Sequence, residues 1–364
     1  MEILTWLGFI LFIIGMLALD LGVFQRRKHK ISVKEALAWT AFWIALSLAF
    51  NFIIYLWQGP GPATEFLTGY LLEKSLSVDN LFVFLIILTY FNVSQKYWHE
   101  VLFYGIIGAL IMRGIFIGAG ITLINLFHPI LYIFGIILII TAIKVAVKQD
   151  EKIEPEKNPV LRFFRKFLRV TDCYEGDKFI VRRAGKLFVT PLFIVLIAIE
   201  TTDVVFAMDS VPAIFGITLN PFIVYTSNVF AILGLRALFF ALAGFMERVY
   251  YLNYGLGIIL AFIGVKILMP AFSYVIPGFH YEIPTEYALG VVACVLLVAT
   301  LASYARSRRT QKGMKSPEKG KPDGKATGTE KGRSEYKECT GGITKSPAGK
   351  EDAVSQEPPK PEKR

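Results

Sequence analysis

Stretches of about 20 apolar residues recur along the first 305 residues of this chain, and they limit its possible folds more than any other feature. A helix of about 20 apolar residues is long enough to cross a hydrocarbon core of roughly 30 Å. The composition agrees, because 54% of the residues are hydrophobic and only 19% are charged. A soluble domain of this length would need much more polar surface. The pattern therefore predicts an all-α, polytopic membrane protein embedded in a lipid bilayer.

We predict about nine transmembrane helices, at 3–24, 35–57, 66–91, 101–124, 128–147, 187–216, 221–243, 252–272 and 285–305. The basic residues test this layout, because cytoplasmic loops of membrane proteins are enriched in Lys and Arg. Of the 39 Lys and Arg, 34 lie in alternate loops and the tail, namely 25–34, 92–100, 148–186, 244–251 and the residues after 305. The intervening loops hold none. We therefore expect a multi-pass protein of the cell membrane with its N-terminus outside and its C-terminus in the cytoplasm.

Three regions follow from this layout: a transmembrane domain over 1–305, a basic cytoplasmic loop over 148–186 within it, and a tail over 306–364. The N-terminus lacks the basic start and the cleavage site of a signal peptide, so the first span is expected to stay in the protein. The loop is either short amphipathic structure at the headgroup surface or a solvated connector. The tail is rich in Lys, Gly, Pro, Ser and Glu, which predicts a disordered basic segment that suits an anionic leaflet and not nucleic acid.

Four carboxylates lie inside the predicted spans at a repeated interval. Glu73 precedes Asp79 by six residues in EKSLSVDN, and Asp203 precedes Asp209 by six residues in DVVFAMDS. Charged side chains at bilayer depth are costly, and they are rare unless they face a polar cavity or a partner. Their recurrence in matching context points to a pore or binding site built from two related halves.

Two further pairs of rare charges recur in the same order. Arg113 in GALIMRGIF corresponds to Arg236 in AILGLRALF. Lys144 in GIILIITAIK corresponds to Lys266 in GIILAFIGVK. Matched charges in matched order indicate a duplication more strongly than matched apolar residues, which arise easily by chance.

The duplication predicts two repeats of three helices each, over 66–147 and 187–272. Since three is an odd number, the second repeat enters the membrane from the opposite side. Inverted repeats of this kind place substrate near the bilayer midplane, where discontinuous helices expose backbone groups. Pro212 would free a carbonyl one turn back and is the predicted position of such a break.

Helical geometry limits how these acids can meet. Glu73 and Asn80 are seven residues apart, so they lie on one helix face about two turns apart. Asp79 lies about a third of a turn away from that face. The second acidic segment has the same spacing. The acids of one segment converge on one ion only if the helix unwinds locally or if carboxylates of both repeats surround a shared axis.

Oxygen ligands from Asp, Glu, Asn and Ser suit hard divalent cations such as Mn²⁺, Mg²⁺ or Ca²⁺, whereas zinc or copper would favour His and Cys. The four histidines lie at loops or helix ends. A carboxylate kept out of water could also load and release a proton as the ion moves. We expect a transported divalent cation and no permanently bound cofactor. The candidate metal ligands are Glu73, Asp79, Asn80, Glu200, Asp203, Asp209 and Ser210, with a supporting amide from Asn228.

A purely structural role for these acids is the alternative. Arg113 and Arg236 could pair with them as buried salt bridges that only fix helix packing. The intramembrane acids, which include Asp20 near the end of the first span, outnumber these two arginines. The set as a whole therefore favours a binding site, with Asp20, Arg113 and Arg236 as charge partners.

Four stretches resemble the TerC family of integral membrane proteins, and its Alx-type members in particular. They are LALDLGVF at 17–24, FLTGYLLEKSLSVDNLFVF at 66–84, ETTDVVFAMDSVPAIFGIT at 200–218 and NPFIVYTSNVFAILGLRALFFAL at 220–242. The family was named for tellurium resistance. The resemblance implies membrane cation export, with links to manganese efflux and to metal supply for exported enzymes. It also implies that the acidic positions given above matter for that function.

Two functions compete. The first is a secondary transporter that exports Mn²⁺ or a similar divalent cation in exchange for protons; no GxxxxGK[ST] motif supports ATP hydrolysis. The second is a non-transporting membrane scaffold in a tellurite- or metal-stress response or in a protein-export complex, with the basic loop and the tail docking membrane protein partners. The spans hold no nucleophile–base–acid set, so we do not expect an enzyme.

Overall fold

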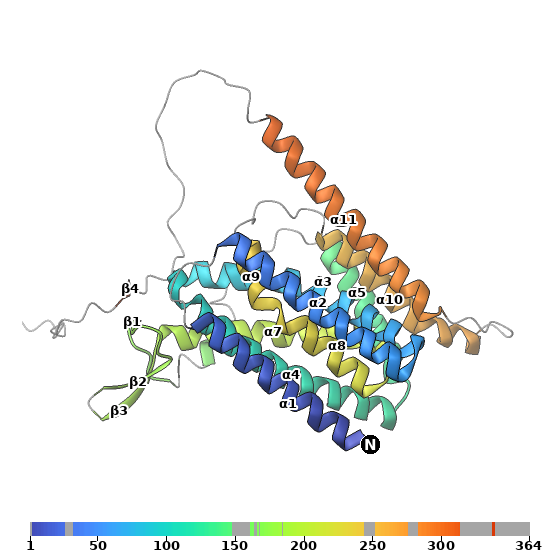
Figure 1. The fold of residues 1–364 in the computed structure, drawn as a ribbon, viewed down its shortest axis with the longest axis horizontal. Helices are drawn as coiled ribbons and strands as arrows, with labels where there is room; N and C mark the ends of the chain where they lie inside the picture. Colours follow the sequence, from blue (N-terminus) through green and yellow to red (C-terminus); the bar gives the residue numbers. More distant parts are fainter. Residues whose placement is uncertain are drawn as a thin grey trace, which may run out of the picture.

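A computed structural model of the chain shows a helical bundle, in agreement with the predicted all-α, polytopic membrane fold (Figure 1). The structure describes residues 2–25, 32–147, 161–163, 166, 168–183, 185–243, 252–275, 283–313 and 337–338. A small β-hairpin lies beyond one end of the bundle, and we call this the hairpin end.

The described α-helices are α1 (Glu2–Gln25), α2 (Val33–Gln58), α3 (Pro60–Tyr90), α4 (Trp98–Leu126), α5 (Ile130–Val147), α7 (Pro191–Phe215), α8 (Pro221–Leu233), α9 (Leu235–Ala243), α10 (Leu252–Val275) and α11 (Thr285–Gly313). The short 3-10 turn η1 (Gln95–Tyr97) precedes α4. The strands are β1 (Cys173–Tyr174), β2 (Ile180–Arg183), β3 (Lys186–Val189) and β4 (Lys337–Glu338). Each of the nine predicted spans falls on helix for most of its length.

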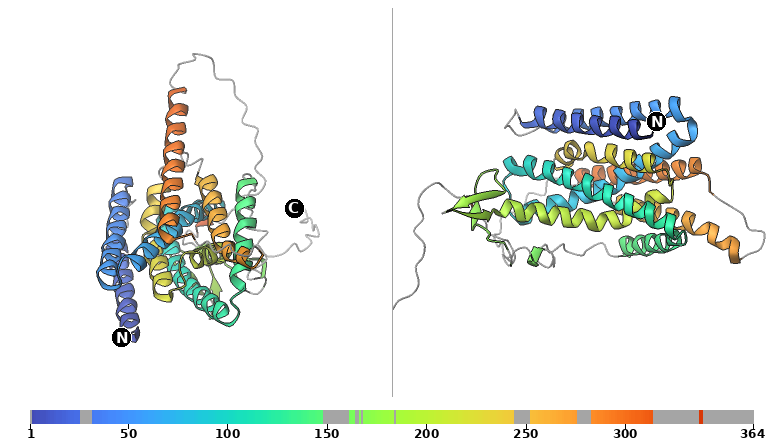
Figure 2. Two further views of the ribbon diagram at one scale, coloured as in Figure 1. Left: turned by 90° about the vertical axis from the view of Figure 1, so that its right-hand side faces the viewer. Right: turned by 90° about the horizontal axis from the view of Figure 1, so that it is seen from below.

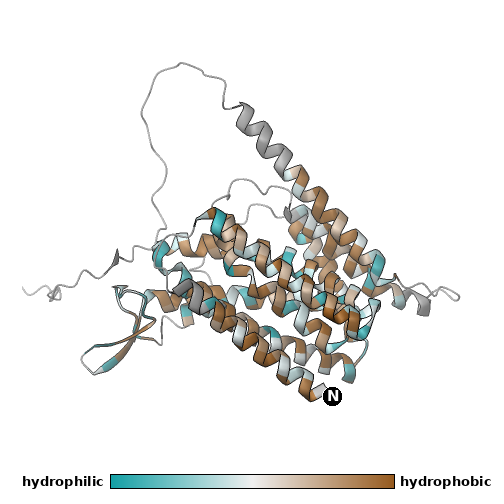
Figure 3. Ribbon diagram, in the orientation of Figure 1, coloured by the Kyte–Doolittle hydropathy of each residue, from teal (hydrophilic) through white to brown (hydrophobic). Residues whose placement is uncertain are grey.

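Six described segments are long and apolar enough to cross a membrane. They are Ile3–Asp20, Val33–Gln58, Gln95–Leu126, Pro191–Phe215, Pro221–Ala243 and Thr285–Ser303. Helices α5 and α10 carry shorter apolar segments. Helix α3 is continuous, but charged residues divide its apolar sequence. Apolar residues dominate the helices along the bundle (Figure 3). The count of nine crossings therefore stays a prediction, while the multi-pass membrane fold is clear.

Glycine, proline and small polar residues set the helix boundaries. Gly59 has φ +94°, a conformation that favours glycine, and it separates α2 from α3. Pro60 then opens α3 at a position where its missing N–H costs nothing. Asn220 caps α8, because its side chain accepts hydrogen bonds from the N–H groups of Phe222 and Ile223 at 3.1 and 3.4 Å.

Two predicted spans differ from the structure. The predicted span 187–216 begins in strand β3, and helix α7 starts only at Pro191. Thr190 is extended there, at φ −88° and ψ 164°, as the residue before a proline prefers. The predicted span 221–243 is interrupted at Gly234, which separates α8 from α9. The break predicted at Pro212 is absent, since α7 continues through that residue.

The predicted basic loop over 148–186 is described only in part. Strands β2 and β3 form an antiparallel hairpin whose register runs from the Ile180–Val189 pair to the Arg183–Lys186 pair. Strand β1 pairs in parallel with β4, which comes from the predicted tail. Residues 148–160 and the tail residues 314–336 and 339–364 lie outside the described part of the chain.

Most helices of the bundle pack against one particular partner helix. Helix α5 packs on α10, α3 on α8, α4 on α7, and α2 on α9. Figure 2 shows α1 and α2 together on one side of the bundle and α5 on the opposite side. Helices α5 and α10 approach closely, because a Cβ atom on Gly264 would lie 2.9 Å from the carbonyl oxygen of Gly135. Helices α3, α4, α7 and α8 meet in the interior and carry the candidate site.

Candidate functional site

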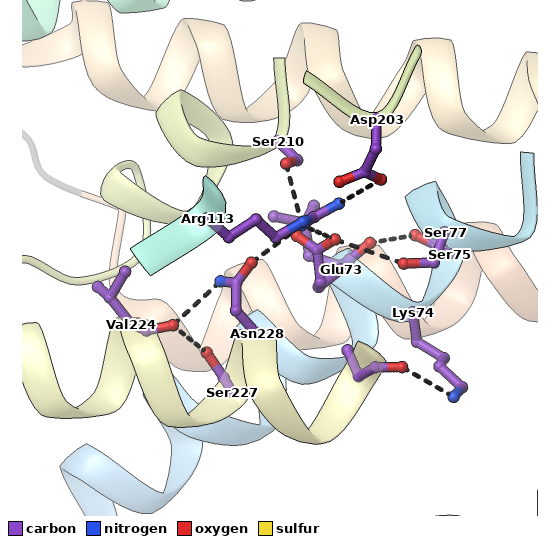
Figure 4. Close-up of polar contacts among 12 residues, drawn as sticks. Glu73, Lys74, Ser75, Ser77, Arg113, Asp203, Ser210, Val224, Ser227 and Asn228 are labelled. Atoms are coloured by element: carbon purple, nitrogen blue, oxygen red, sulfur yellow. Dashed lines mark hydrogen bonds and ion pairs between the residues drawn. The ribbon is translucent and has the colours of Figure 1, made fainter. Parts of the chain in front are cut away.

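The guanidinium of Arg113 lies at the centre of a buried polar cluster. Nη1 donates hydrogen bonds to Glu73 Oε1, to Asn228 Oδ1 at 3.0 Å and to Ser210 Oγ at 3.2 Å. Nη2 lies 3.6 Å from Asp203 Oδ1. We call Glu73, Asp203, Ser210 and Asn228 the Arg113 cradle. Figure 4 shows these four side chains pointing toward the guanidinium.

Three helices supply the residues of the cradle, and a fourth helix supplies Arg113. Glu73 comes from α3, Asp203 and Ser210 from α7, Asn228 from α8, and Arg113 itself from α4. Asp203 and Ser210 are seven residues apart on α7, so both face the same side of the helix, as the sequence predicts. The Asn228 amide nitrogen donates to the carbonyl of Val224 at 3.0 Å, which turns its amide oxygen toward Arg113. Helices α3 and α7 thus bring a carboxylate each to one place.

Water has almost no access to the cradle. The exposed fraction is 0% for Glu73, 6% for Asp203 and 1% for each of Ser210, Asn228 and Arg113. Two carboxylates face one guanidinium, so the formal charge of the cluster is −1. A buried cluster with unbalanced charge is costly, because the interior of a bundle screens charge poorly.

Several polar atoms around the cradle have no hydrogen-bond partner within the described residues. They are Glu73 Oε2, Asp203 Oδ2, Glu200 Oε1 and Arg113 Nε. Buried polar atoms are rarely left unsatisfied, and those that are need an explanation such as an ion or a catalytic role. The unpartnered atoms are mostly carboxylate oxygens, so the group that would satisfy them is a cation or a donor.

Glu200 lies outside the cradle, against glycines of α4. A Cβ atom on Gly108 would overlap the Glu200 carboxylate, and one on Gly105 would lie 3.8 Å from its Oε1. The absence of side chains at these two positions makes the space for a carboxylate between α4 and α7. Glu200 is one turn before Asp203, whose negative charge acts on it.

Asp209 faces a different neighbour, helix α5. The hydroxyl of Thr141 donates to Asp209 Oδ1 at 2.8 Å, and Lys144 lies near enough to act on this carboxylate electrostatically. Asn80 is buried on α3, with 5% of its surface exposed. Asp79 belongs to α3, but its side chain lies outside the described part of the structure.

The structure therefore divides the predicted ligands among separate places. Within the described residues, no group of three or more His, Cys, Asp or Glu side chains is arranged to hold a metal ion. The cradle instead combines two carboxylates with a hydroxyl and an amide oxygen. Such an oxygen set is the type that hard divalent cations bind. In this structure a guanidinium fills it.

A second buried ion pair joins α1 to α9. Nη2 of Arg236 lies 2.8 Å from Asp20 Oδ2 and donates to the Asp20 backbone carbonyl at 2.9 Å. The Arg236 guanidinium also lies over the ring of Phe103, 5.7 Å from its centroid. Asp20 and Arg236 thus contact each other and stand apart from the cradle.

One contact was not anticipated from the sequence. Nζ of Lys74 donates to the carbonyl of Ala231 at 3.1 Å, near the C-terminal end of α8 and next to the break at Gly234 (Figure 4). A cation at the C-terminal end of a helix is stabilised by its dipole. A lysine beside Glu73 in an apolar span indicates a buried cation, but the sequence does not predict which group accepts its hydrogen bond. Thr141, the partner of Asp209, carried no signal at all.

Comparison with known proteins gives a family and close relatives. The sequence model described as "Integral membrane protein TerC family" matches residues 58–311. An uncharacterised membrane protein of Myxococcus xanthus is 44% identical over 303 residues, covering 83% of this chain and 92% of the relative. The protein named "Putative membrane-bound redox modulator Alx" in Escherichia coli K12 is 46% identical over 304 residues, covering 81% and 92%. No solved structure matches the chain.

Proposed function

The chain belongs to the TerC family of integral membrane proteins, and on that premise we propose that it is a secondary transporter that exports divalent metal cations. The substrate we propose is Mn²⁺, carried in exchange for protons. The observation that carries the proposal is the convergence of Glu73 and Asp203 from α3 and α7 on one buried point. Carboxylates at this depth are functional-site candidates by default.

The helix pairs support a two-fold arrangement of the site. If α3, α4 and α5 correspond to α7, α8–α9 and α10, then α3 on α8 is the counterpart of α7 on α4. The pairs α5 on α10 and α3 on α7 would lie across the axis itself. Alternating access in inverted repeats moves one repeat against the other around a central site, and the cradle draws its ligands from both.

The donor chemistry supports a hard divalent cation, and the choice of Mn²⁺ among such ions comes from the family resemblance. The distribution of Lys and Arg supports a cytoplasmic hairpin end and an external N-terminus in the cell membrane. Export would then begin with binding from the hairpin end.

A set of neutralising substitutions tests the proposal. We expect Glu73→Gln, Asp79→Asn, Asp203→Asn and Asp209→Asn to abolish Mn²⁺ efflux at unchanged protein levels in the membrane. The matched control is Glu65→Gln. Glu65 also lies on α3, but it accepts a hydrogen bond from Thr218 at 2.6 Å outside the cradle, and its variant should retain efflux. The readout is cellular manganese content under manganese challenge, and normal export by all four variants would reject the site.

A scaffold role is the alternative, and the buried pair of Arg113 and Glu73 favours it, because an ion pair that only fixes helix packing needs nothing further. The relatives' name assigns a redox role to those proteins and names no ion. Deleting residues 161–186 separates the two proposals. A scaffold loses function with the hairpin and tolerates the neutralised acids, whereas a transporter shows the reverse.

A further inference from the structure

We propose that the Arg113 guanidinium is a tethered counter-cation: it occupies the substrate site of the empty protein and leaves it when a divalent cation binds. This inference rests on the proposed transport function and concerns the regulation of the same site. It makes substrate and guanidinium mutually exclusive occupants of the Arg113 cradle.

The first argument is that the cradle fits a guanidinium poorly. Nη1 carries two hydrogens but faces three acceptors, on Glu73, Ser210 and Asn228. Arginine binds carboxylates best through two parallel hydrogen bonds, and neither carboxylate here is bound in that way. Nη2 is 3.6 Å from Asp203, and Nε has no partner among the described residues. Three acceptors thus compete for Nη1, while Nε donates to none of the described residues.

The second argument is that the same oxygens fit a spherical dication. Two oxygens from each carboxylate, the hydroxyl of Ser210 and the amide oxygen of Asn228 make six possible oxygen ligands in the cradle. Hard cations such as Mn²⁺ and Mg²⁺ take about six oxygen ligands. Glu73 Oε2 and Asp203 Oδ2 are buried and unpartnered, so the cradle holds two oxygens that the guanidinium does not use. A dication would also cancel the formal charge of the two carboxylates.

The third argument concerns the empty protein. Two carboxylates without a counter-charge are costly at bilayer depth, so the substrate-free site needs a cation between them. Arg113 provides that cation on a side chain that cannot be exported. The arrangement stabilises the substrate-free site, and it forces a dication to compete with a resident charge.

A displaced guanidinium needs a new partner, and Glu200 offers one. Its Oε1 is buried without a partner in the described structure, and it lies against Gly108, five residues before Arg113 on α4. Glu200 also lies one turn before Asp203 on α7, and Nη2 of Arg113 already faces Asp203. Side chains on a helix lean toward its N-terminus, which is the direction of Gly108 and Glu200 along the axis from Arg113. Glu200 would therefore hold the guanidinium while the substrate holds the cradle.

The test is a Mn²⁺ titration of the purified full chain in lipid nanodiscs, with free Mn²⁺ measured by EPR. If Arg113 fills the cradle for 90 to 99% of the time, its removal should tighten binding about 10- to 100-fold. We expect this gain for Arg113→Gln, near wild-type affinity for Arg113→Lys, and loss of binding for Glu73→Gln and Asp203→Asn. Gly118→Ala is the background control on α4, where a Cβ atom meets only open space.

The role of Glu200 is tested by combining variants. Glu200→Gln should weaken Mn²⁺ binding when Arg113 is present, because the displaced guanidinium loses its acceptor. It should have no effect in the Arg113→Gln background. Equal weakening in both backgrounds would identify Glu200 as a direct ligand and overturn its role as the acceptor.

Other outcomes separate this inference from the proposed function. Unchanged or weaker binding by a monodisperse Arg113→Gln protein, with binding still lost in Glu73→Gln, overturns the tethered counter-cation alone. No Mn²⁺ binding by the wild-type protein overturns the transport site itself. If Arg113→Gln does not fold, pulsed EPR on Mn²⁺ bound to wild-type protein with ¹⁵N-labelled arginine decides the matter. An arginine nitrogen beside bound Mn²⁺ contradicts displacement, and its absence supports it.

Discussion

The ion pair between Asp20 and Arg236 gives a prediction that can be worked out in numbers. Both residues are nearly inaccessible, with 4% and 2% of their surfaces exposed, and Nη2 lies 2.8 Å from Oδ2. At an effective dielectric constant of about 20, two unit charges at this distance attract by about 6 kcal/mol. Removing one partner leaves the other charge buried and costs about 3 to 5 kcal/mol. We therefore expect Asp20→Ala and Arg236→Met each to lower the free energy of unfolding by about this amount.

The double variant is the decisive member of the set. With both charges removed, neither is left buried without the other, so we expect the double variant to be more stable than the sum of the two single losses predicts, by about 2 to 3 kcal/mol. Equilibrium unfolding of the purified chain in mixed micelles, followed by circular dichroism, measures all four free energies. Mn²⁺ binding should be unchanged in Asp20→Ala, because the pair lies outside the Arg113 cradle. Losses that simply add would show that the two charges do not stabilise each other.

Two further predictions concern helix α5 and the helix packed on it. Gly264→Ala should destabilise the chain by about 1 to 3 kcal/mol, because its Cβ atom would lie 2.9 Å from the backbone carbonyl oxygen of Gly135, whereas Gly118→Ala on α4 should be neutral or slightly stabilising; equal melting temperatures for the two variants would contradict this. Thr141→Val should cost about 1 to 3 kcal/mol, since Asp209 loses a hydrogen bond of 2.8 Å, and Thr141→Ser should restore it; a valine variant as stable as the wild type would argue against that bond.

The sequence predicted the helices well because each apolar stretch needs a helix to cross lipid. It was less successful where local chemistry competes with hydropathy. Residues 187–189 are apolar enough to extend a span, yet they pair with β2, and the helix waits for Pro191. Pro212 was expected to break α7, but α7 continues through it. The break lies instead in the predicted span 221–243, at Gly234, which the sequence does not distinguish from the other glycines of the spans. A proline inside a helix is tolerated when neighbouring groups satisfy the backbone, and the sequence does not report those neighbours.

The candidate site was predictable in its residues and only partly in its arrangement. The spacing of Asp203 and Ser210 predicted a shared face, and both side chains contact Arg113. The sequence left open whether the acids meet each other or an arginine, and the structure shows two of them meeting at the same arginine. Which acid faces which helix depends on tertiary packing, so the turn of Asp209 toward Thr141 had no counterpart in the sequence.

The adjacency of Glu73 and Lys74 restricts how α3 can move. Successive residues of a helix point about 100° apart, so these two neighbours contact different helices: Glu73 accepts from the guanidinium of Arg113 on α4, and Lys74 donates to the carbonyl of Ala231 on α8. Turning α3 about its own axis would withdraw an acid and an ammonium from their partners at once and move both charges against the other helices that surround α3. Translation along the axis or tilting keeps each within reach. A conformational change that keeps both contacts must therefore translate or tilt α3 and cannot rotate it about its axis.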